Sequence, residues 1–269
     1  MVHVGLIGCG TIGGELARTI EQRYHRTARL VALHDTNRLH AKTLQRQLRS
    51  HPPIVSLHQV IRRSTLVIEA ASAAVVPTVV AAALRAHRDV FVMSAGGLLR
   101  SPAAWRRILR RSRGRLYIPS GALAGLDGIK ALATGRIRRV TLTTRKPPRA
   151  LTEAPYVRQR GLRLERLRRP TVIFDGTARD VVRAFPQNTN VAAALTLASG
   201  VAPHRTRVRI VADPTIRVNL HEVDVEGSCG RIQCRVQSRP SRNPKTSELA
   251  VRSALVTLRR FFDPVVIGS

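Results

Sequence analysis

Three glycines with the spacing Gly-x-Gly-x-x-Gly stand near the start of the chain. Gly8, Gly10 and Gly13 lie between an apolar segment at 2–7 and a segment at 12–24 with helical periodicity. In this pattern the first glycine turns the chain sharply, the second lets backbone approach a pyrophosphate, and the third lets helix and strand pack closely. The spacing and its flanks therefore predict a dinucleotide site.

Two further features fit the same site. At the expected helix start, the backbone N–H groups of Thr11 and Ile12 are free to bind phosphate. Asp35 follows an apolar segment at 30–33, where its carboxylate can accept hydrogen bonds from ribose hydroxyls and repel a 2′-phosphate. Because Arg38 follows closely and could hold that phosphate, we expect NAD to be preferred and NADP to be tolerated.

Small residues follow three other expected strands. They are Ala71 and Ser72 after 66–69, Ser94–Gly97 after 90–93, and Ser120–Gly125 after 115–118. The carboxyl ends of parallel strands meet at one edge of a sheet, where open α/β folds bind ligands. Small residues there fit a flat nicotinamide close to backbone, although ordinary strand-to-helix turns would have the same composition.

A predicted hairpin places one histidine on an apolar face. Segments 217–226 and 231–237 are expected strands, and one register brings opposite charges together on one face and apolar residues on the other. The predicted pairs are Glu226–Arg231, Asp224–Gln233, Glu222–Arg235, Val225–Ile232, Val223–Cys234 and His221–Val236. Histidine titrates near neutrality and can accept a proton. From the residues alone, His221 is either a core histidine or a catalytic one, and His204 is its rival.

The elements that carry these residues alternate over the first 118 residues. The expected strands are 2–7, 30–33, 66–69, 90–93 and 115–118, with 54–57 as a possible addition, and the expected helices are 12–24, 39–49, 75–87 and 103–112. Such alternation predicts a parallel sheet covered on both faces. We therefore expect an α/β chain that begins with a Rossmann dinucleotide-binding domain at 1–119.

The pattern changes after residue 120. A helix at 121–133 is expected to precede strands at 138–144, 171–175, 207–212, 217–226 and 231–237, with helices near 178–184 and 190–198 and a loop with at most a short helix at 147–170. We expect an α+β domain at 120–240, with a mixed sheet and helices on one face. A last helix at 246–262 is expected to pack back on the first domain.

Composition limits the class of protein. Of the 269 residues 43% are apolar, and no apolar run approaches the roughly 20 residues that span a bilayer. No basic segment precedes an apolar stretch at the N-terminus, so we expect a cytoplasmic enzyme with no membrane partner. Cys9, Cys229 and Cys234 form no Cys-x-x-Cys motif and no cluster with histidine, which argues against a disulfide framework and against a metal site.

The net charge of +30 comes almost entirely from arginine. Clustered arginine would suggest nucleic acid, but aromatic residues make up only 3% of the chain and no nucleic-acid module is recognisable. We interpret the charge as an arginine bias over an enzyme scaffold, with only non-specific, salt-dependent binding to nucleic acid.

Eight sequence strings together resemble the L-aspartate dehydrogenase family. They run in the family's order and cover nearly the whole chain, and the strings that contain Thr-Arg-Lys-Pro-Pro and Asn-Pro-Lys-Thr-Ser are the most specific. The strings are Gly8–Gly13, Glu69–Ser72, Ser120–Asp127, Thr143–Pro148, Phe185–Ala193, Asp213-Pro214, Asn219–His221 and Asn243–Ser247.

The resemblance implies NAD(P)-dependent oxidative deamination of L-aspartate to iminoaspartate, which hydrolyses to oxaloacetate and ammonia. The imine can also feed NAD biosynthesis. By the same match, Ala124 and Asn190 are nicotinamide-cofactor positions and His221 is the catalytic histidine, with Asn219 beside it as a substrate candidate. The resemblance also implies that the domain at 120–240 is the substrate, catalytic and dimerisation domain, with a homodimer formed through its sheet.

A substrate with two carboxylates needs cationic or N–H-rich anchors. Only four of the basic residues are lysines, namely Lys42, Lys130, Lys146 and Lys245. In a chain that uses arginine almost everywhere, a retained lysine suggests a compact charge that a guanidinium would not replace, although chance retention would look the same. Lys146 and Lys245 are therefore candidate anchors. Further candidates are Arg145 and the backbone N–H groups of Ser120, Gly121 and Ala122.

Three alternatives stay open at this stage. One is a related oxidoreductase for another small acid, similar to dihydrodipicolinate reductase or homoserine dehydrogenase. Another is an arginine-rich nucleic-acid-binding protein on a Rossmann scaffold. The last is an inactive relative that binds NAD as a sensor, which the joint presence of Asp35, Asn190 and His221 disfavours.

Overall fold

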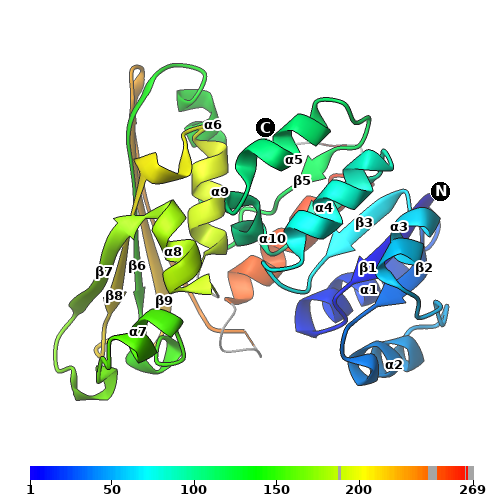
Figure 1. Cartoon of the computed structure of the whole chain (residues 1–269), viewed down its shortest axis with the longest axis horizontal. Coiled ribbons are helices and arrows are strands. Elements are labelled where there is room, and N and C mark those ends of the chain that lie inside the picture. The colour runs from blue at the N-terminus through cyan, green and yellow to red at the C-terminus, as the bar shows by residue number, and fades with distance from the viewer. Residues whose placement is uncertain (187–188, 242–246, 264, 266–269) are drawn as a thin grey trace. The chain divides into compact units, whose positions relative to one another are not determined.

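The computed structural model describes residues 1–186, 189–241, 247–263 and 265. The chain forms two compact units (Figure 1). Met1–Pro119 and Ala254–Val266 make the first, and Ser120–Ser253 make the main part of the second. Each unit is built on its own five-stranded sheet.

The first unit has the Rossmann type of architecture that the sequence predicts. Its strands are β1 (Val2–Ile7), β2 (Ala28–His34), β3 (Leu66–Glu69), β4 (Asp89–Val92) and β5 (Leu116–Tyr117), all parallel and in the order β2-β1-β3-β4-β5. Its helices are α1 (Thr11–Arg23), α2 (Arg38–Gln47), α3 (Leu57–Arg63), α4 (Val76–Arg85), the 3-10 helix η1 (Ala95–Leu99) and α5 (Pro102–Leu109). The strand order reverses between β1 and β3, and ligands bind at such a switch point.

Alternate residues of β1 face opposite layers, which explains its nearly continuous apolar sequence. Val4 and Leu6 belong to a core cluster with residues of α1, α2 and α10 (Glu248–Arg259). Gly5 faces α3, where an added Cβ would lie 2.5 Å from Val60. Both faces of the sheet are therefore covered, as parallel sheets require.

The possible strand at 54–57 is wrong. Ile54 forms only an isolated parallel bridge with Leu33, and Leu57 begins α3, so β3 is the third strand of the chain. Ser56 caps this helix by accepting a hydrogen bond from the Gln59 N–H, and the Gln59 side chain accepts from the Ser56 N–H in return. A Ser-x-x-Gln capping box is the sequence signal of a helix start here, and the apolar pattern alone misses it.

The second unit contains the predicted mixed sheet. Its strands are β6 (Ile137–Lys146), β7 (Thr171–Thr177), β8 (Thr206–Ala212), β9 (Asn219–Gly227) and β10 (Gly230–Ser238), in the order β10-β9-β6-β8-β7. The pair β6/β8 is parallel and the other three pairs are antiparallel. Its helices are α6 (Leu126–Leu132), η2 (Pro148–Ala150), α7 (Pro155–Gln159), η3 (Leu164–Arg166), α8 (Ala178–Ala184), α9 (Asn190–Ala198) and η5 (Pro203–Arg205). Figure 1 shows α6, α8 and α9 on one side of this sheet.

The helix expected at 121–133 is only half as long. Gly121 and Gly125 have φ angles of 66° and 75°, which break a right-handed helix, and α6 begins at Leu126. An added Cβ at Gly125 would lie 2.6 Å from the Cys234 sulfur. Gly125 therefore allows the chain to approach β10 closely, whereas an added Cβ at Gly121 would meet nothing within 4 Å. The predicted start of the last helix at 246 lies outside the described residues, and α10 ends at Arg259.

The register of the β9/β10 hairpin is confirmed at every predicted pair, including His221–Val236 and Glu226–Arg231. His221, Val223 and Val225 are buried, as expected for the apolar face. The opposite face carries ion pairs, with Arg231 bound to Asp224 at 2.7 Å and Arg139 of β6 bound to Glu226 at 3.0 Å. These are diagonal or cross-strand pairs between exposed arginines and half-buried carboxylates, so they specify the register more than they stabilise the sheet.

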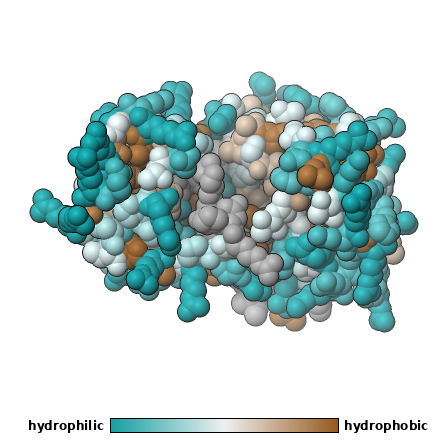
Figure 2. Space-filling model, turned by 90° about the horizontal axis from the view of Figure 1, so that it is seen from below, coloured by the Kyte–Doolittle hydropathy of each residue, from teal (hydrophilic) through white to brown (hydrophobic). Residues whose placement is uncertain are grey.

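Hydrophilic side chains cover most of the face shown in Figure 2, in keeping with the arginine content. Large apolar side chains that are exposed among the described residues, such as Leu39, Val172 and Val256, come from different elements. Within the described part of the chain, every helix is too short or too polar to cross a membrane.

Candidate active site

The glycine loop connects β1 to α1 at the switch point of the first sheet. Gly8 has a φ angle of 97°, and an added Cβ would lie 2.5 Å from the Ala70 carbonyl group. At Gly13 an added Cβ would lie 1.9 Å from the Gly8 oxygen. Both positions require glycine, because the loop packs against the turn after β3 and against the first turn of α1.

Gly10 differs from the other two glycines. An added Cβ would meet no atom within 4 Å, and the residue is exposed at the N-terminal end of α1. Thr11 and Ile12 follow as the first residues of the helix, with Thr11 exposed. Open space beside a helix N-terminus is what a pyrophosphate needs, so the loop fits a dinucleotide cofactor.

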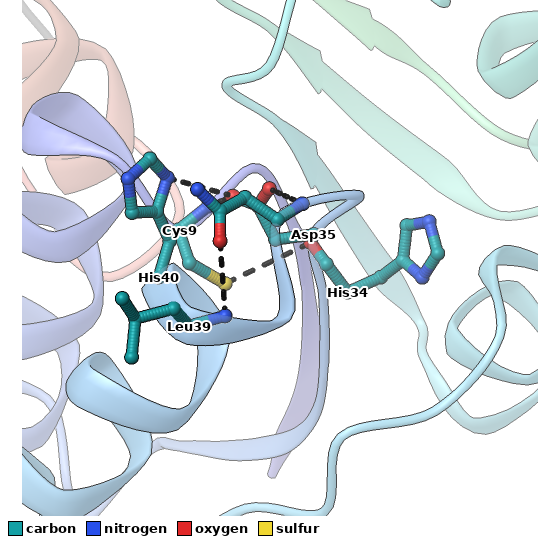
Figure 3. A network of polar contacts seen from close by, with 6 residues as sticks. Cys9, His34, Asp35, Leu39 and His40 are labelled. Atoms are coloured by element: carbon teal, nitrogen blue, oxygen red, sulfur yellow. Dashed lines mark hydrogen bonds and ion pairs between the residues drawn. The ribbon is translucent and has the colours of Figure 1, made fainter.

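Asp35 follows β2 and its carboxylate is bound by backbone N–H groups (Figure 3). Cys9 donates to Oδ2 at 2.7 Å and Asn37 donates to Oδ1 at 2.8 Å, and the His40 ring lies 4.0 Å from Oδ2. Burial, and then the Asp35 charge, raise the pKa of the Cys9 thiol to about 12, so Cys9 stays protonated. We interpret Cys9 as a packing residue, and Asp35 as the group that holds the glycine loop beside the end of β2.

Glu69 is a buried acid that the sequence reasoning did not single out. Its Oε1 accepts a hydrogen bond from the Ala71 N–H at 2.9 Å, and its Oε2 accepts from the Ser94 N–H at 3.0 Å. Burial raises the pKa of this carboxyl above its usual range. Glu69 therefore ties the turn after β3, with exposed Ala71 and Ser72, to the turn after β4. The sequence signal for Glu69 is a single acid at the end of an apolar strand.

His221 lies on the buried face of the second sheet. Its Nδ1 is 3.0 Å from the Thr144 Oγ1 of β6, and the two residues are directly opposite each other in the β6/β9 ladder. Burial, and then the charge of nearby Lys146, lower the pKa of the imidazole to about 3. The ring is therefore neutral near pH 7. Thr144 is a site residue that the sequence indicates only as a member of the Thr143–Pro148 string.

Lys146 is the last residue of β6, two residues beyond Thr144 on the same face. Its side chain is buried, and burial lowers the pKa of the ammonium to about 8. Asp213, which is also buried, follows the neighbouring strand β8 and donates its N–H to the Lys146 carbonyl at 2.9 Å. A buried lysine with a pKa near neutrality is typical of a functional site.

The remaining predicted site residues differ in burial. Asn219 is buried two residues before His221 on β9, which brings it to the same face. Ser120 and Gly121 are half-buried, Ala122 is buried, Ala124 is exposed, and exposed Asn190 begins α9. His204, the rival of His221, is exposed in η5. Lys245 lies outside the described residues.

The site residues thus fall into two groups, one in each unit. Gly8–Gly13, Asp35, Ala71 and Ser72 gather at the carboxyl edge of the first sheet. Thr144, Lys146, Asn219 and His221 gather on one face of the second sheet. The first group can hold a dinucleotide, and the second offers two buried nitrogen bases that differ widely in pKa.

Comparison with known proteins covers both units. The family described as aspartate dehydrogenase, C-terminal, matches residues 127–261, and the one described as homoserine dehydrogenase, NAD binding domain, matches residues 8–116. The crystal structure of aspartate dehydrogenase from Thermotoga maritima has a TM-score of 0.76 at 24% identity over the full length of both chains, which shows the shared fold.

Full-length relatives decide the family. L-aspartate dehydrogenase from Methanosarcina barkeri is 43% identical, and the match covers all of both chains. L-aspartate dehydrogenase 3 from Bordetella bronchiseptica is 35% identical, with 99% of this chain and 97% of the relative covered. The chain therefore belongs to the L-aspartate dehydrogenase family.

Proposed function

We propose that this chain oxidatively deaminates L-aspartate. The balanced reaction is L-aspartate, NAD⁺ and water giving oxaloacetate, ammonium, NADH and a proton. The observation that carries the proposal is the pair of buried bases, His221 and Lys146, on one face of the second sheet in a member of this family. A homodimer through this sheet and a cytoplasmic location stay predictions from the sequence.

The first unit supplies the cofactor site. NAD, when bound, accepts the hydride that leaves the substrate. We propose that the N–H groups at Thr11 and Ile12 bind its pyrophosphate beside Gly10, and that Asp35 accepts from ribose hydroxyls. Ala71 and Ser72, and by family match Ala124 and Asn190, are the proposed contacts of the nicotinamide half.

The second unit supplies proton chemistry. The substrate ammonium must lose a proton before its carbon can be oxidised, and an acceptor works best when its pKa is near the working pH. The pKa of Lys146, about 8, meets this condition, whereas the pKa of His221, about 3, does not. We therefore propose that the neutral Lys146 amine contacts the substrate ammonium and takes its proton, in place of the carboxylate anchor expected from composition.

The substrate carboxylates need other partners in this arrangement. The backbone N–H groups of Ser120, Gly121 and Ala122 and the buried amide of Asn219 are the proposed ones. Lys245, which belongs to the most specific sequence string, stays a proposed anchor from the sequence.

The substrate assignment predicts NADH formation with L-aspartate and much less with L-glutamate, L-alanine or L-malate, measured by absorbance. His221→Ala and His221→Gln are expected to lower kcat by roughly 100-fold or more, because a polar contact to the reacting substrate is lost. Circular dichroism and thermal unfolding of both variants control for folding. NADH formation with none of the four compounds would refute the proposed reaction.

Gly10→Ala tests the cofactor site. The backbone at Gly10, with φ of −75° and ψ of −161°, accommodates alanine, and the added Cβ meets nothing in the protein. We expect an unchanged melting temperature and a Kd for NADH raised about 10-fold, since the methyl group occupies space next to the phosphates. Gly13→Ala is the contrasting variant and should lower the melting temperature, because its Cβ collides with the Gly8 oxygen. Unchanged NADH affinity in Gly10→Ala would place the pyrophosphate elsewhere.

The lowered pKa of Lys146 predicts that kcat/KM rises with pH. A base must be deprotonated to act, and kcat/KM reports the pKa values of the free enzyme, so kcat/KM for L-aspartate should increase as pH passes about 8. Lys146→Arg keeps the cation but cannot lose its proton, and should lower kcat by roughly 100-fold. Lys130→Arg, on α6, is the matched control and should behave as the parent. A Lys146→Arg enzyme with nearly full kcat, or activity that falls above pH 8, would instead make Lys146 a carboxylate anchor.

Asp35 predicts a preference for NAD in matched kcat/KM measurements with both cofactors. Asp35→Asn removes the charge that repels a 2′-phosphate and should shift the kcat/KM ratio about 10-fold toward NADP. Asp89→Asn is the control, because Asp89 also accepts from a backbone N–H, that of Arg115, but stands at the start of β4. A parent enzyme that strongly prefers NADP would overturn the role given to Asp35.

A further inference from the structure

Thr144 and His221 form a buried cross-strand pair. They are direct partners in the β6/β9 ladder, and each side chain is on a residue only 3% exposed. The Thr144 Oγ1 and the His221 Nδ1 are 3.0 Å apart, a good hydrogen-bond distance. The direction of this bond decides which ring nitrogen carries the proton.

The direction of the hydrogen bond between Thr144 and His221 follows from what the Thr144 hydroxyl can contact. A hydroxyl can donate or accept, and a neutral imidazole has one N–H and one acceptor nitrogen. Within the part of the chain that the structure describes, Nδ1 is the one acceptor that the Thr144 hydroxyl contacts. If Nδ1 carried the proton, the buried O–H would have no acceptor, which costs free energy. We therefore assign the hydroxyl as the donor to Nδ1, which places the ring proton on Nε2.

Burial keeps the His221 ring in its neutral form, and a neighbouring charge adds to the effect. Desolvation, and then the ammonium of Lys146 on the same strand as Thr144, oppose a second proton on His221. A neutral ring whose Nδ1 accepts from Thr144 has Nε2–H as its remaining polar group, and that group can only donate.

We propose that Thr144 is a positioning residue that holds His221 in the Nε2–H tautomer, so that the imidazole donates a hydrogen bond to an oxygen of the bound dicarboxylate. The inference rests on the proposed function, and it adds a role for Thr144 and a direction for the His221 contact. It also separates two tasks, since the donor is His221 and the proton acceptor is Lys146.

Thr143 provides a matched control on the same strand. Successive residues of a strand point to opposite faces, so Thr143, opposite Glu222 in the ladder, lies on the face of the ion pairs. Thr143→Val makes the same chemical change as Thr144→Val, but it removes a hydroxyl from the opposite face of the sheet. Thr144→Ser keeps the hydroxyl and tests rescue.

The tautomer can be measured without turnover. In protein labelled with ¹⁵N-histidine, the His221 signals are those absent from the spectrum of His221→Gln, and couplings to the ring protons distinguish the two nitrogens. At pH 7 we expect Nε2 protonated and Nδ1 unprotonated in the parent, in Thr144→Ser and in Thr143→Val. In Thr144→Val we expect a mixture of tautomers. A parent ring protonated on Nδ1 would overturn the proposal.

Kinetics provide the second readout. Thr144→Val is expected to lower kcat/KM for L-aspartate by about 10-fold or more. Without the Thr144 hydroxyl, the ring loses the hydrogen bond that positions it, and the buried Nδ1 is left without a donor. Thr144→Ser should recover most of the loss, and Thr143→Val should show none. Unchanged kcat/KM and tautomer in Thr144→Val would refute the proposal. An Nε2–H ring in an enzyme inactive on aspartate would refute the proposed function and leave the effect of Thr144 on the resting ring standing.

Discussion

The ladder between β6 and β9 determines which residues share the buried face of the second sheet. It sets Thr144 opposite His221 and Thr143 opposite Glu222. A slip by one residue would exchange His221 for Glu222, moving an acid to the apolar face and the histidine among ion pairs. Both faces resist that slip, one through burial and the other through opposite charges. The position of the candidate catalytic ring is therefore a result of sheet packing.

Burial gives the two bases pKa values below their usual ranges. Desolvation lowers the pKa of a cationic group, and a neighbouring cation lowers it further. Burial lowers the pKa of Lys146 to about 8, and burial together with the Lys146 charge lowers the pKa of His221 to about 3. In the proposed arrangement, Lys146 exchanges a proton near neutrality and the neutral His221 ring donates a hydrogen bond. Pairs whose pKa values are driven apart in this way are how acid and base roles are assigned in enzymes.

The parts of the structure that depend on interactions within a few residues could be predicted from the sequence. The glycine loop and the β9/β10 register could be read from the sequence, because turn geometry and alternation of side chains act over a few residues. Helix α3 was missed because its signal is a capping box. The start of α6 was placed too early because Gly121 and Gly125 have positive φ angles, and Gly125 also packs closely on β10. Thr144 could not be identified as a site residue without the β6/β9 pairing, which joins strands far apart in the chain.

The proposed role of Lys146 gives a chemical reason for a lysine at this position in a chain with so few lysines. Among the lysines that the structure describes, Lys42 is exposed, Lys130 is half-buried and Lys146 is buried. A guanidinium is always charged in proteins, so arginine could supply a cation at the end of β6 but never a neutral amine. If a compact charge were all that the site required, arginine at position 146 would keep part of the activity. A site that needs a base able to lose its proton excludes arginine, even in a chain whose other basic positions are almost all arginine.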